Sequence, residues 1–522
     1  MSQTNQEILR FNWNPAKTEL ILGPPGTGKT YRLMAKLDES LRIYNAKRIC
    51  FVAFTKKAAT EATTRAADQF GLTSEDLLHF RTLHSFAFRQ MGYSSKQIMG
   101  IGDYINIAKS LGMFISYRGL KDDGSFHGQS KGDRLLFLTN LARIQNKTIA
   151  QVHADWLDEN LTVYEIQLMH DTIESYKFEN GKKDFTDVIQ DYVENGYVPD
   201  LDVLFVDESQ DLAPIQWTMV SKLAEKANYV YIAGDDDQAI FRWAGADVSQ
   251  FINIPVGKTT VLDQSYRVPS KIATVANRII DNVSTRHKKA WKPRMEIGVA
   301  RFINNIDVLD MSTGSWLLLA RNSYLLEEFS TFCMRRGFVF ESNQGSPIAP
   351  EVLNAIKLYE KLRKGKTITV GQGLLIYEYI STKVGVRYGM KTVLKAENPE
   401  TLISLTDMEN KYGLLTTAIW HEALDRIPLD QKDYLLGALK HGEKIDEARI
   451  RVSTIHGVKG GEADNVVLLC DMAKRTYLEY QNNPDDEARV WYVGVTRARQ
   501  NLYIVYPRTP NHYPLDIILR SQ

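Results

Sequence analysis

Short apolar runs alternate with longer amphipathic stretches along much of the chain. Several runs have the length of a strand and few polar positions; they are residues 18–22 (TELIL), 48–54 (RICFVAF), 201–207 (LDVLFVD) and 229–234 (YVYIAG). Continuous apolar runs of this length are typical of parallel strands that are buried on both faces. The stretch 31–40, which follows the first run, has the pattern of a helix. The pattern therefore predicts an α/β fold with parallel sheets.

Two segments replace this alternation with a mainly helical pattern. A chain of 522 residues is too long for one core, and about three or four domains of roughly 100–200 residues are expected. The predicted division is a first parallel-sheet domain (1–89 and 181–265) with a helical insertion (90–180), and a second parallel-sheet domain (266–345 and 447–522) with a shorter insertion (346–446).

Composition narrows the class of protein. The hydrophobic and charged fractions, 44% and 24%, are those of a globular protein, and the net charge of +1 gives no global positive field. Cys50, Cys333 and Cys470 are far apart and lie in apolar surroundings, which predicts core positions rather than disulfides or a metal site. The N-terminus lacks the apolar core of a signal peptide, and no apolar stretch has the length of a membrane span. We therefore expect a cytoplasmic protein without a membrane partner.

Residues 23–30 match the P-loop pattern G-x-x-x-x-G-K-S/T at every specified position. Glycines in such a turn let backbone N–H groups point at a phosphate, and the following helix adds the positive end of its dipole. Lys29 is predicted to reach the outer phosphates of ATP, and the Thr30 hydroxyl to bind Mg²⁺. An ordinary Gly/Pro turn is the alternative, and the Lys-Thr pair argues against it. The predicted ATP contacts are Gly23, Pro24, Pro25, Gly26, Thr27, Gly28, Lys29, Thr30 and Tyr31.

A pair of carboxylates, Asp207 and Glu208, ends the apolar run 201–207. Ligands of open α/β sheets bind at the carboxyl ends of the strands, and two adjacent carboxylates there require a cation. We expect Asp207 to hold Mg²⁺ and Glu208 to orient and deprotonate the attacking water. A solvated acidic turn is the alternative, which the P-loop disfavours. Gln238, after the run 229–234, is expected to hydrogen-bond the γ-phosphate or its water.

Polar and aromatic residues also follow other predicted strands. Thr82 and His84 lie in FRTLHSFA (80–87), and Trp243 lies in an aromatic and basic cluster after Gln238. A tryptophan face stacks on nucleic-acid bases, although tryptophan is more often a core or interface residue. These residues suit contacts with a nucleic acid, but they predict one only if other features of the sequence argue for it. The basic run 286–294 (RHKKAWKPR) is predicted to be a solvated loop.

The ordered set of motifs resembles the UvrD/Rep/PcrA-like superfamily 1 DNA helicases over most of the chain. After the P-loop, the motifs are FTKKAATEATTR (54–65), FRTLHSFA (80–87), VDESQDLAPIQW (206–217), GDDDQAIFRWAGAD (234–247), LDQSYRVPSKI (262–272), LLLARN (317–322), VSTIHGVKGGEADNVVLL (452–469) and WYVGVTRARQNLYIV (491–505). Each motif is only moderately specific, whereas their order is very specific.

The resemblance implies two RecA-like domains with ATP in the cleft between them. Tyr266 is expected to stack on adenine, Glu462 to accept from the ribose hydroxyl, and Arg267 and Arg497 to contact the γ-phosphate as arginine fingers. The family's adenine-reading glutamine has no clear equivalent, since Gln6 stands in a different sequence context. The implied track for single-stranded DNA comprises Phe54, Thr55, Thr82, His84, Trp243, Thr454 and His456.

The implied activity is that of an ATP-dependent DNA helicase or translocase that moves 3′→5′ on single-stranded DNA. Its expected partners are single-stranded DNA, single-strand/duplex junctions and an unidentified loading, replication or repair protein. The alternative is a DNA-stimulated ATPase or nucleotide switch without processive unwinding of its own. A helicase–nuclease is disfavoured because no additional carboxylate cluster follows Val505.

Overall fold

The computed structural model describes residues 11–520 apart from 12, 117–129, 157–159, 343–344, 346 and 445–446. Contacts between residues divide the chain into two compact units. The first runs up to Gly298 and also includes Leu478–Thr496, and the second comprises Val299–Tyr477 and the residues from Arg497 onward. Each unit contains one six-stranded sheet, and all the strand pairs in both sheets are parallel. The predicted fold class, two parallel-sheet α/β domains, is confirmed.

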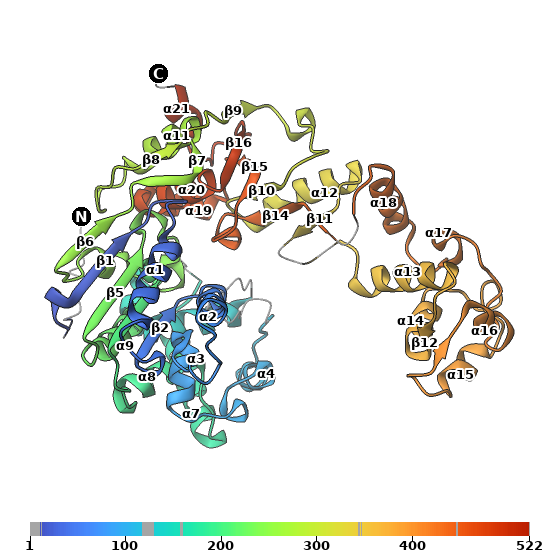
Figure 1. Ribbon diagram of the computed structural model, residues 1–522, viewed down its shortest axis with the longest axis horizontal. Helices are drawn as coiled ribbons and strands as arrows, with labels where there is room; N and C mark the ends of the chain where they lie inside the picture. Colours follow the sequence, from blue (N-terminus) through green and yellow to red (C-terminus); the bar gives the residue numbers. More distant parts are fainter. Residues whose placement is uncertain are drawn as a thin grey trace. The chain divides into compact units, whose positions relative to one another are not determined.

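The first sheet has the strand order β3-β2-β4-β5-β1-β6. Figure 1 shows β1, β5 and β6 side by side in this unit. Its strands are β1 (Thr18–Leu22), β2 (Ile49–Ala53), β3 (Phe80–Thr82), β4 (Val203–Asp207), β5 (Tyr229–Gly234) and β6 (Lys258–Val261).

Helices cover both faces of this sheet, which explains the continuous apolar runs in the sequence. Ile21 and its neighbours on one face pack against α1 (Lys29–Leu41) and α2 (Lys56–Phe70). Leu20 and Leu22, which point the other way, belong to a second core with the remaining helices of the face. Those helices are α3 (Leu83–Gln90), α8 (Phe185–Asn195), α9 (Pro214–Ala224) and α10 (Val248–Ile252).

The helical insertion after α3 has its own core. Leu135 and Leu138 of one helix pack with Ile166 and Met169 of another. The helices of the insertion are α4 (Ile101–Ser110), α5 (Lys131–Ile144), α6 (Ile149–Asp155) and α7 (Val163–Asn180).

The first unit includes the segment that follows residue 265. Ser265 Oγ donates to the Pro25 carbonyl (2.7 Å) and Tyr266 N donates to the Gly26 carbonyl (2.8 Å), so this segment lies on the P-loop. The four-part division stays a prediction. The elements that contacts join to the first unit are β7 (Gln264–Pro269), α11 (Ser270–Ile280), β8 (Lys292–Arg294) and α20 (Pro484–Val495).

The second unit has a sheet of order β11-β14-β10-β15-β16-β9. Its strands are β9 (Val299–Ile303), β10 (Trp316–Ala320), β11 (Phe340–Ser342), β14 (Ile450–Thr454), β15 (Ala463–Leu469) and β16 (Ala498–Val505). The apolar positions of β10 and β14 continue into the core of the helical insertion, so the sheet and the insertion share one hydrophobic cluster.

The insertion of the second unit is mostly helical. A short antiparallel pair, β12 (Ile368–Thr369) with β13 (Leu402–Ile403), accompanies the helices. The remaining helices of the chain are α12 (Leu326–Arg336), α13 (Pro350–Arg363), α14 (Val370–Glu378), α15 (Met390–Lys395), α16 (Leu405–Asn410), α17 (Trp420–Ala423), α18 (Leu429–Lys440), α19 (Lys474–Asn482) and α21 (Leu515–Arg520).

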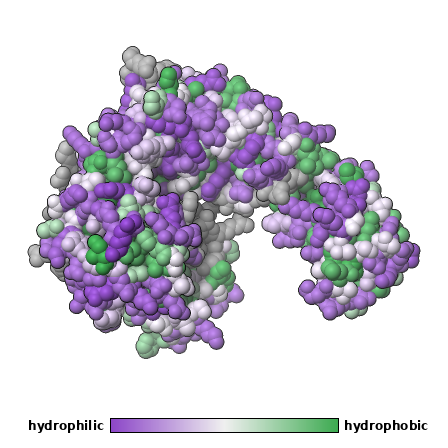
Figure 2. All heavy atoms as spheres, in the orientation of Figure 1, coloured by the Kyte–Doolittle hydropathy of each residue, from purple (hydrophilic) through white to green (hydrophobic). Residues whose placement is uncertain are grey.

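The three cysteines occupy the core positions that the sequence predicts. Cys50, Cys333 and Cys470 are all buried. On the face shown in Figure 2, hydrophilic residues dominate and hydrophobic ones occur in small groups. None of the helices in the described part of the chain is both long and apolar enough to span a bilayer.

Candidate functional site

The P-loop connects β1 to α1 in the conformation that the sequence predicts. Gly26 and Gly28 have φ of 71° and 79°, in the left-handed region that favours glycine. A Cβ on Gly26 would also lie 2.3 Å from Cβ of Arg267, so the close approach of β7 requires glycine here. Thr27 Oγ1 donates to the Pro24 carbonyl (2.8 Å) and fixes the turn. The start of α1 is thus arranged to bind an anion.

Lys29, the first residue of α1, forms an ion pair with Glu208. Its Nζ lies 2.9 Å from Glu208 Oε1, and the lysine side chain is 11% exposed. Burial opposes the charge of Lys29, but Glu208 and Asp207 outweigh it and hold the lysine pKa above its usual value. Lys29 therefore carries its positive charge at any pH of interest, and a phosphate must compete with Glu208 for it.

Asp207 lies at the carboxyl end of β4 and is 1% exposed. Burial, followed by the charge of Glu208, raises the pKa of Asp207 to about 7. A bound divalent cation would favour the ionised carboxylate, so this environment fits the predicted Mg²⁺ ligand. Thr30 stands one residue after Lys29, in the first turn of α1.

Glu208 has a left-handed backbone, with φ of 52°, which is uncommon for a residue with a side chain. Its amide donates to Asp207 Oδ1 (2.8 Å), and Gln210 Nε2 donates to Glu208 Oε2 (2.6 Å). These contacts hold the predicted general base in one orientation. Gln210 is a residue that the sequence did not single out, although its place in DESQD put it two positions from the base.

Gln238 follows β5 and is tied to the same edge of the sheet. Its Nε2 donates to Asp235 Oδ2 (2.6 Å), and Asp235 N donates to Gln210 Oε1 (3.0 Å). Contacts therefore run from Gln238 through Asp235 and Gln210 to Glu208 and Lys29. The structure brings these predicted residues together, while their catalytic roles stay predictions.

Two tyrosines flank the P-loop with exposed rings. Tyr31 is 74% exposed and Tyr266 is 73% exposed. The Tyr266 amide donates to the Gly26 carbonyl, so the backbone of this residue lies against the phosphate turn, and its role in adenine stacking stays a prediction. Arg267 is the next residue on β7 and packs against Gly26. Gln6 lies outside the described residues.

Arg497 and Glu462 lie near one another in the second unit. Ala463 N donates to the Arg497 carbonyl (3.2 Å), and Arg497 Nη1 donates to the Gly461 carbonyl (3.2 Å). Arg497 is 2% exposed. Glu462 Oε1 lies 3.5 Å from Nη1 of Arg499, a partner that the sequence did not indicate.

Two threonines of the predicted DNA track have a structural role. The Thr55 hydroxyl accepts from Ala58 N (3.2 Å) at the start of α2, and Thr82 accepts from Ser85 N (3.3 Å) at the start of α3. Both are N-caps, which satisfy backbone donors that would otherwise lack a partner. In the second unit, Thr454 is buried and its hydroxyl accepts from Gly457 N (3.1 Å), while His456 begins a short 3₁₀ turn.

The aromatic members of the track gather in the first unit. The ring centroids of Phe54 and Phe241 are 5.8 Å apart, and those of Phe241 and Trp243 are 6.3 Å apart. Phe54, Phe241 and His84 line a cavity of about 100 Å³ that helix α5 of the insertion borders. Burial lowers the pKa of His84 to about 4, against the opposing effect of Asp184, so this imidazole is neutral at pH 7. It can stack or hydrogen-bond but cannot attract phosphate by charge.

We expect Trp243→Ala to weaken binding of single-stranded DNA by about 1–3 kcal/mol, the usual contribution of one stacked base. ATP binding in the absence of DNA should change little. Trp243 also packs against the core of the helical insertion, so some stability will be lost. Fluorescence anisotropy with a labelled oligonucleotide measures the affinity.

The matched control for Trp243→Ala is Trp156→Ala. Trp156 packs against the same core, with its ring 5.0 Å from that of Phe137. This control should lose stability without losing DNA affinity. A Trp243→Ala protein that melted earlier but bound DNA normally would support a purely structural tryptophan.

The basic run 286–294 is not the solvated loop that the sequence predicted. The Lys289 side chain is 0% exposed and that of Arg286 is 10% exposed, and Trp291 is buried. Lys289 pairs with three consecutive aspartates, Asp235–Asp237, and Arg286 pairs with Asp237, while Lys292 of the same run stays 73% exposed. The prediction was wrong because charge along the sequence does not reveal which opposite charges fold against it.

Two family models and several known proteins match the sequence of this chain. The family model of the UvrD/REP helicase N-terminal domain matches residues 3–255, and that of the UvrD-like helicase C-terminal domain matches residues 389–509. The ATP-dependent DNA helicase PcrA of Leuconostoc citreum is 28% identical over 292 residues, which are 52% of this chain and 38% of the relative. PcrA of Staphylococcus aureus is 26% identical over 295 residues (52% and 39%), and the helicase Rep of Buchnera aphidicola is 24% identical over 280 residues (50% and 41%).

The chain belongs to the UvrD-like family of superfamily 1 helicases. The matched part spans less than half the length of each of these relatives.

Proposed function

We propose that this protein is an ATP-dependent DNA helicase or translocase that moves 3′→5′ on single-stranded DNA. The observation that carries the proposal is the P-loop lysine paired with Glu208 beside the buried Asp207, in a chain of the UvrD-like family. The relatives named above are ATP-dependent DNA helicases, which supports ATP as the nucleotide and DNA as the substrate.

Nucleotide binding is proposed to begin at the P-loop. The β- and γ-phosphates of ATP would draw Lys29 away from Glu208, and adenine would stack on Tyr266. Mg²⁺, held by Thr30 and Asp207, would neutralise phosphate charge. Release of Glu208 from its ion pair leaves this carboxylate able to accept a proton from water.

Hydrolysis is proposed to depend on groups that act on the γ-phosphate and its water. Glu208 acts as the general base, and Gln238 hydrogen-bonds the γ-phosphate or the attacking water. Arg267 and Arg497 donate to the phosphoryl oxygens and stabilise the charge of the transition state. Glu462 accepts from the ribose hydroxyl. Because Arg497 comes from the second unit, hydrolysis is coupled to movement of that unit.

DNA is proposed to contact polar and aromatic groups of both units. The proposed DNA contacts of the first unit are Phe54, Thr55, Thr82, His84 and Trp243. Those of the second unit are Thr454 and His456. Stacking on aromatic faces tolerates any base sequence, which suits movement along a strand. The direction 3′→5′ follows from the resemblance to the UvrD-like family.

Duplexes with one single-stranded tail test the activity and its direction. We expect ATP-dependent unwinding, or displacement of a bound protein block, from a 3′ tail and little from a 5′ tail. ATP hydrolysis should rise when single-stranded DNA is added. Unwinding only from a 5′ tail would contradict the direction. DNA-stimulated hydrolysis without movement on either substrate would favour the alternative, an ATPase or nucleotide switch that does not unwind.

A further inference from the structure

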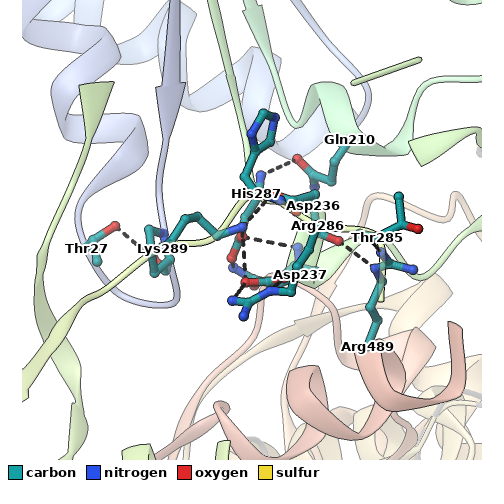
Figure 3. A network of polar contacts seen from close by, with 12 residues as sticks. Thr27, Gln210, Asp236, Asp237, Thr285, Arg286, His287, Lys289 and Arg489 are labelled. Atoms are coloured by element: carbon teal, nitrogen blue, oxygen red, sulfur yellow. Dashed lines mark hydrogen bonds and ion pairs between the residues drawn. The ribbon is translucent and has the colours of Figure 1, made fainter. Parts of the chain in front are cut away.

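A buried ion cluster lies next to the proposed ATP site in the first unit. Asp235, Asp236 and Asp237, directly after β5, are between 0% and 1% exposed. The Lys289 ammonium lies among them, 3.1 Å from Asp235 Oδ1 and 3.0 Å from Asp237 Oδ2, and it also contacts Asp236 Oδ1 (Figure 3). One lysine without solvent contact thus pairs with three carboxylates.

Two arginines complete the charge balance of this cluster. Arg286 donates to both carboxylate oxygens of Asp237, at 2.8 and 2.6 Å. Arg489 of α20 donates from Nε to the Asp236 carbonyl (2.9 Å). Although burial alone would lower it, the carboxylates of Asp235, Asp237 and Asp236 hold the pKa of Lys289 above its usual value. Removal of Lys289 would therefore leave buried negative charge without a partner.

The cluster is connected to the residues proposed to perform hydrolysis. Asp235 Oδ2 accepts from Gln238 Nε2 (2.6 Å), and Asp235 N donates to Gln210 Oε1 (3.0 Å). Gln210 Nε2 in turn donates to Glu208 Oε2 (2.6 Å). Asp235 is therefore the shared support of the γ-phosphate glutamine and of the glutamine that orients the general base.

We propose that Lys289 is a positioning residue of the ATPase site, which acts through Asp235 on Gln238 and Glu208. This inference rests on the proposed ATP hydrolysis. The Lys289 side chain has no exposed surface from which its ammonium could contact a nucleotide, so this side chain acts through the groups that it touches. Its ammonium lies 3.1 Å from Asp235 Oδ1 and holds the carboxylate that accepts from Gln238 Nε2.

The consequence of losing Lys289 follows from its contacts. Without the ammonium, the three buried carboxylates repel one another, and the Asp235 side chain loses the partner that holds it. Asp235 accepts from Gln238 Nε2 and its amide donates to Gln210 Oε1, so a shift of Asp235 moves Gln238 and Gln210 from their present positions. The contact of Gln238 with the γ-phosphate or water, and the orientation of Glu208, are then altered.

The test compares Lys289→Met with Lys177→Met in the full-length protein. Lys177 is a matched control because it is also buried, 5% exposed, and pairs with Asp187 (2.9 Å) and Asp184 (3.3 Å) in the helical insertion. For both variants we would measure three properties: the kinetics of ATP hydrolysis with and without single-stranded DNA, the binding of a fluorescent ATP analogue, and the melting temperature. We expect Lys289→Met to lower kcat by about 10- to 100-fold, part of the roughly 10²–10⁴-fold that positioned proton transfer supplies. KM and the affinity for the analogue should stay within about threefold, less than 1 kcal/mol.

Lys177→Met should melt earlier but keep the parental kcat. Equal losses of kcat in both variants, in proportion to lost stability, would show a structural role only and overturn the inference. A folded Lys289→Met protein with parental kcat would overturn it as well.

A second variant decides the matter if Lys289→Met does not fold. Asp235→Asn keeps the shape and the backbone N–H of the residue but removes the carboxylate that Gln238 contacts. It should lower kcat about tenfold with little change in melting temperature. Parental kcat in Asp235→Asn would overturn the inference.

If Lys29→Ala abolishes hydrolysis while Lys289→Met and Asp235→Asn do not, only this inference fails. A parental protein without ATPase activity would overturn the proposed function and this inference together.

Discussion

Glu208→Gln is expected to abolish ATP turnover while ATP still binds. Glutamine keeps the shape of the side chain and can still accept from Gln210, but it cannot take a proton from water. The loss should be at least about 10²–10⁴-fold, the range that a positioned general base supplies. Because the ion pair of Glu208 with Lys29 at 2.9 Å is also lost, the lysine becomes available to phosphate, and ATP affinity should be equal or higher.

Lys29→Ala should abolish turnover for a different reason. The ammonium is the group that the P-loop offers to the outer phosphates, so this variant is expected to lose ATP affinity as well as hydrolysis. Both variants should remain folded with some loss of stability, since each breaks the Lys29–Glu208 ion pair without removing an apolar core side chain.

Single-turnover hydrolysis and equilibrium binding of a fluorescent ATP analogue separate the two effects. Glu39→Gln is a suitable control, because Glu39 lies on α1 with a side chain that is 57% exposed and pairs with Lys36. It should hydrolyse ATP at the parental rate. Parental single-turnover hydrolysis in Glu208→Gln would show that another group is the base.

Arg497→Ala is expected to lower ATP turnover by about 10³–10⁵-fold, the contribution of an arginine finger in phosphoryl transfer. Movement along DNA should stop, while affinity for single-stranded DNA stays nearly intact. In the structure, the Arg497 guanidinium donates to the Gly461 carbonyl, so a stability loss of about 0.5–1.5 kcal/mol is also expected.

Stopped-flow measurement of translocation on single-stranded DNA, together with steady-state ATP hydrolysis, tests Arg497. Arg497→Lys should recover little activity, since an ammonium cannot reproduce the planar fork of donors. Arg508→Ala, which removes a half-exposed surface ion pair with Glu328 from the same unit, is the control and should behave as the parent. If Arg497→Ala hydrolysed ATP normally but could not move, Arg497 would be a coupling residue rather than a finger.

Local sequence patterns were sufficient for much of the fold and for the centre of the site. The runs at 18–22, 48–54 and 201–207 contain β1, β2 and β4, because a parallel strand buried on both faces must be apolar at nearly every position. The P-loop was equally clear, since its glycines, Lys29 and Thr30 stand at fixed spacing within eight consecutive residues. The predicted members Asp207, Glu208 and Gln238 share one edge of the sheet because the carboxyl ends of parallel strands lie there.

The sequence could not reveal how groups distant along the chain are paired. The basic run 286–294 has the composition of a solvated loop, and the tertiary structure places the Lys289 side chain among Asp235–Asp237. The N-cap roles of Thr55 and Thr82, and the link through Gln210, likewise depend on backbone geometry.

The sequence by itself determined the fold class, the phosphate-binding turn and the acidic strand end, because short-range geometry and burial impose these patterns locally. Tertiary structure alone decided which distant charges neutralise one another and that Asp235 holds Gln210 beside the general base. Those outcomes depend on contacts between residues tens to hundreds of positions apart, such as Lys289 with Asp236 and Arg489 with the Asp236 carbonyl.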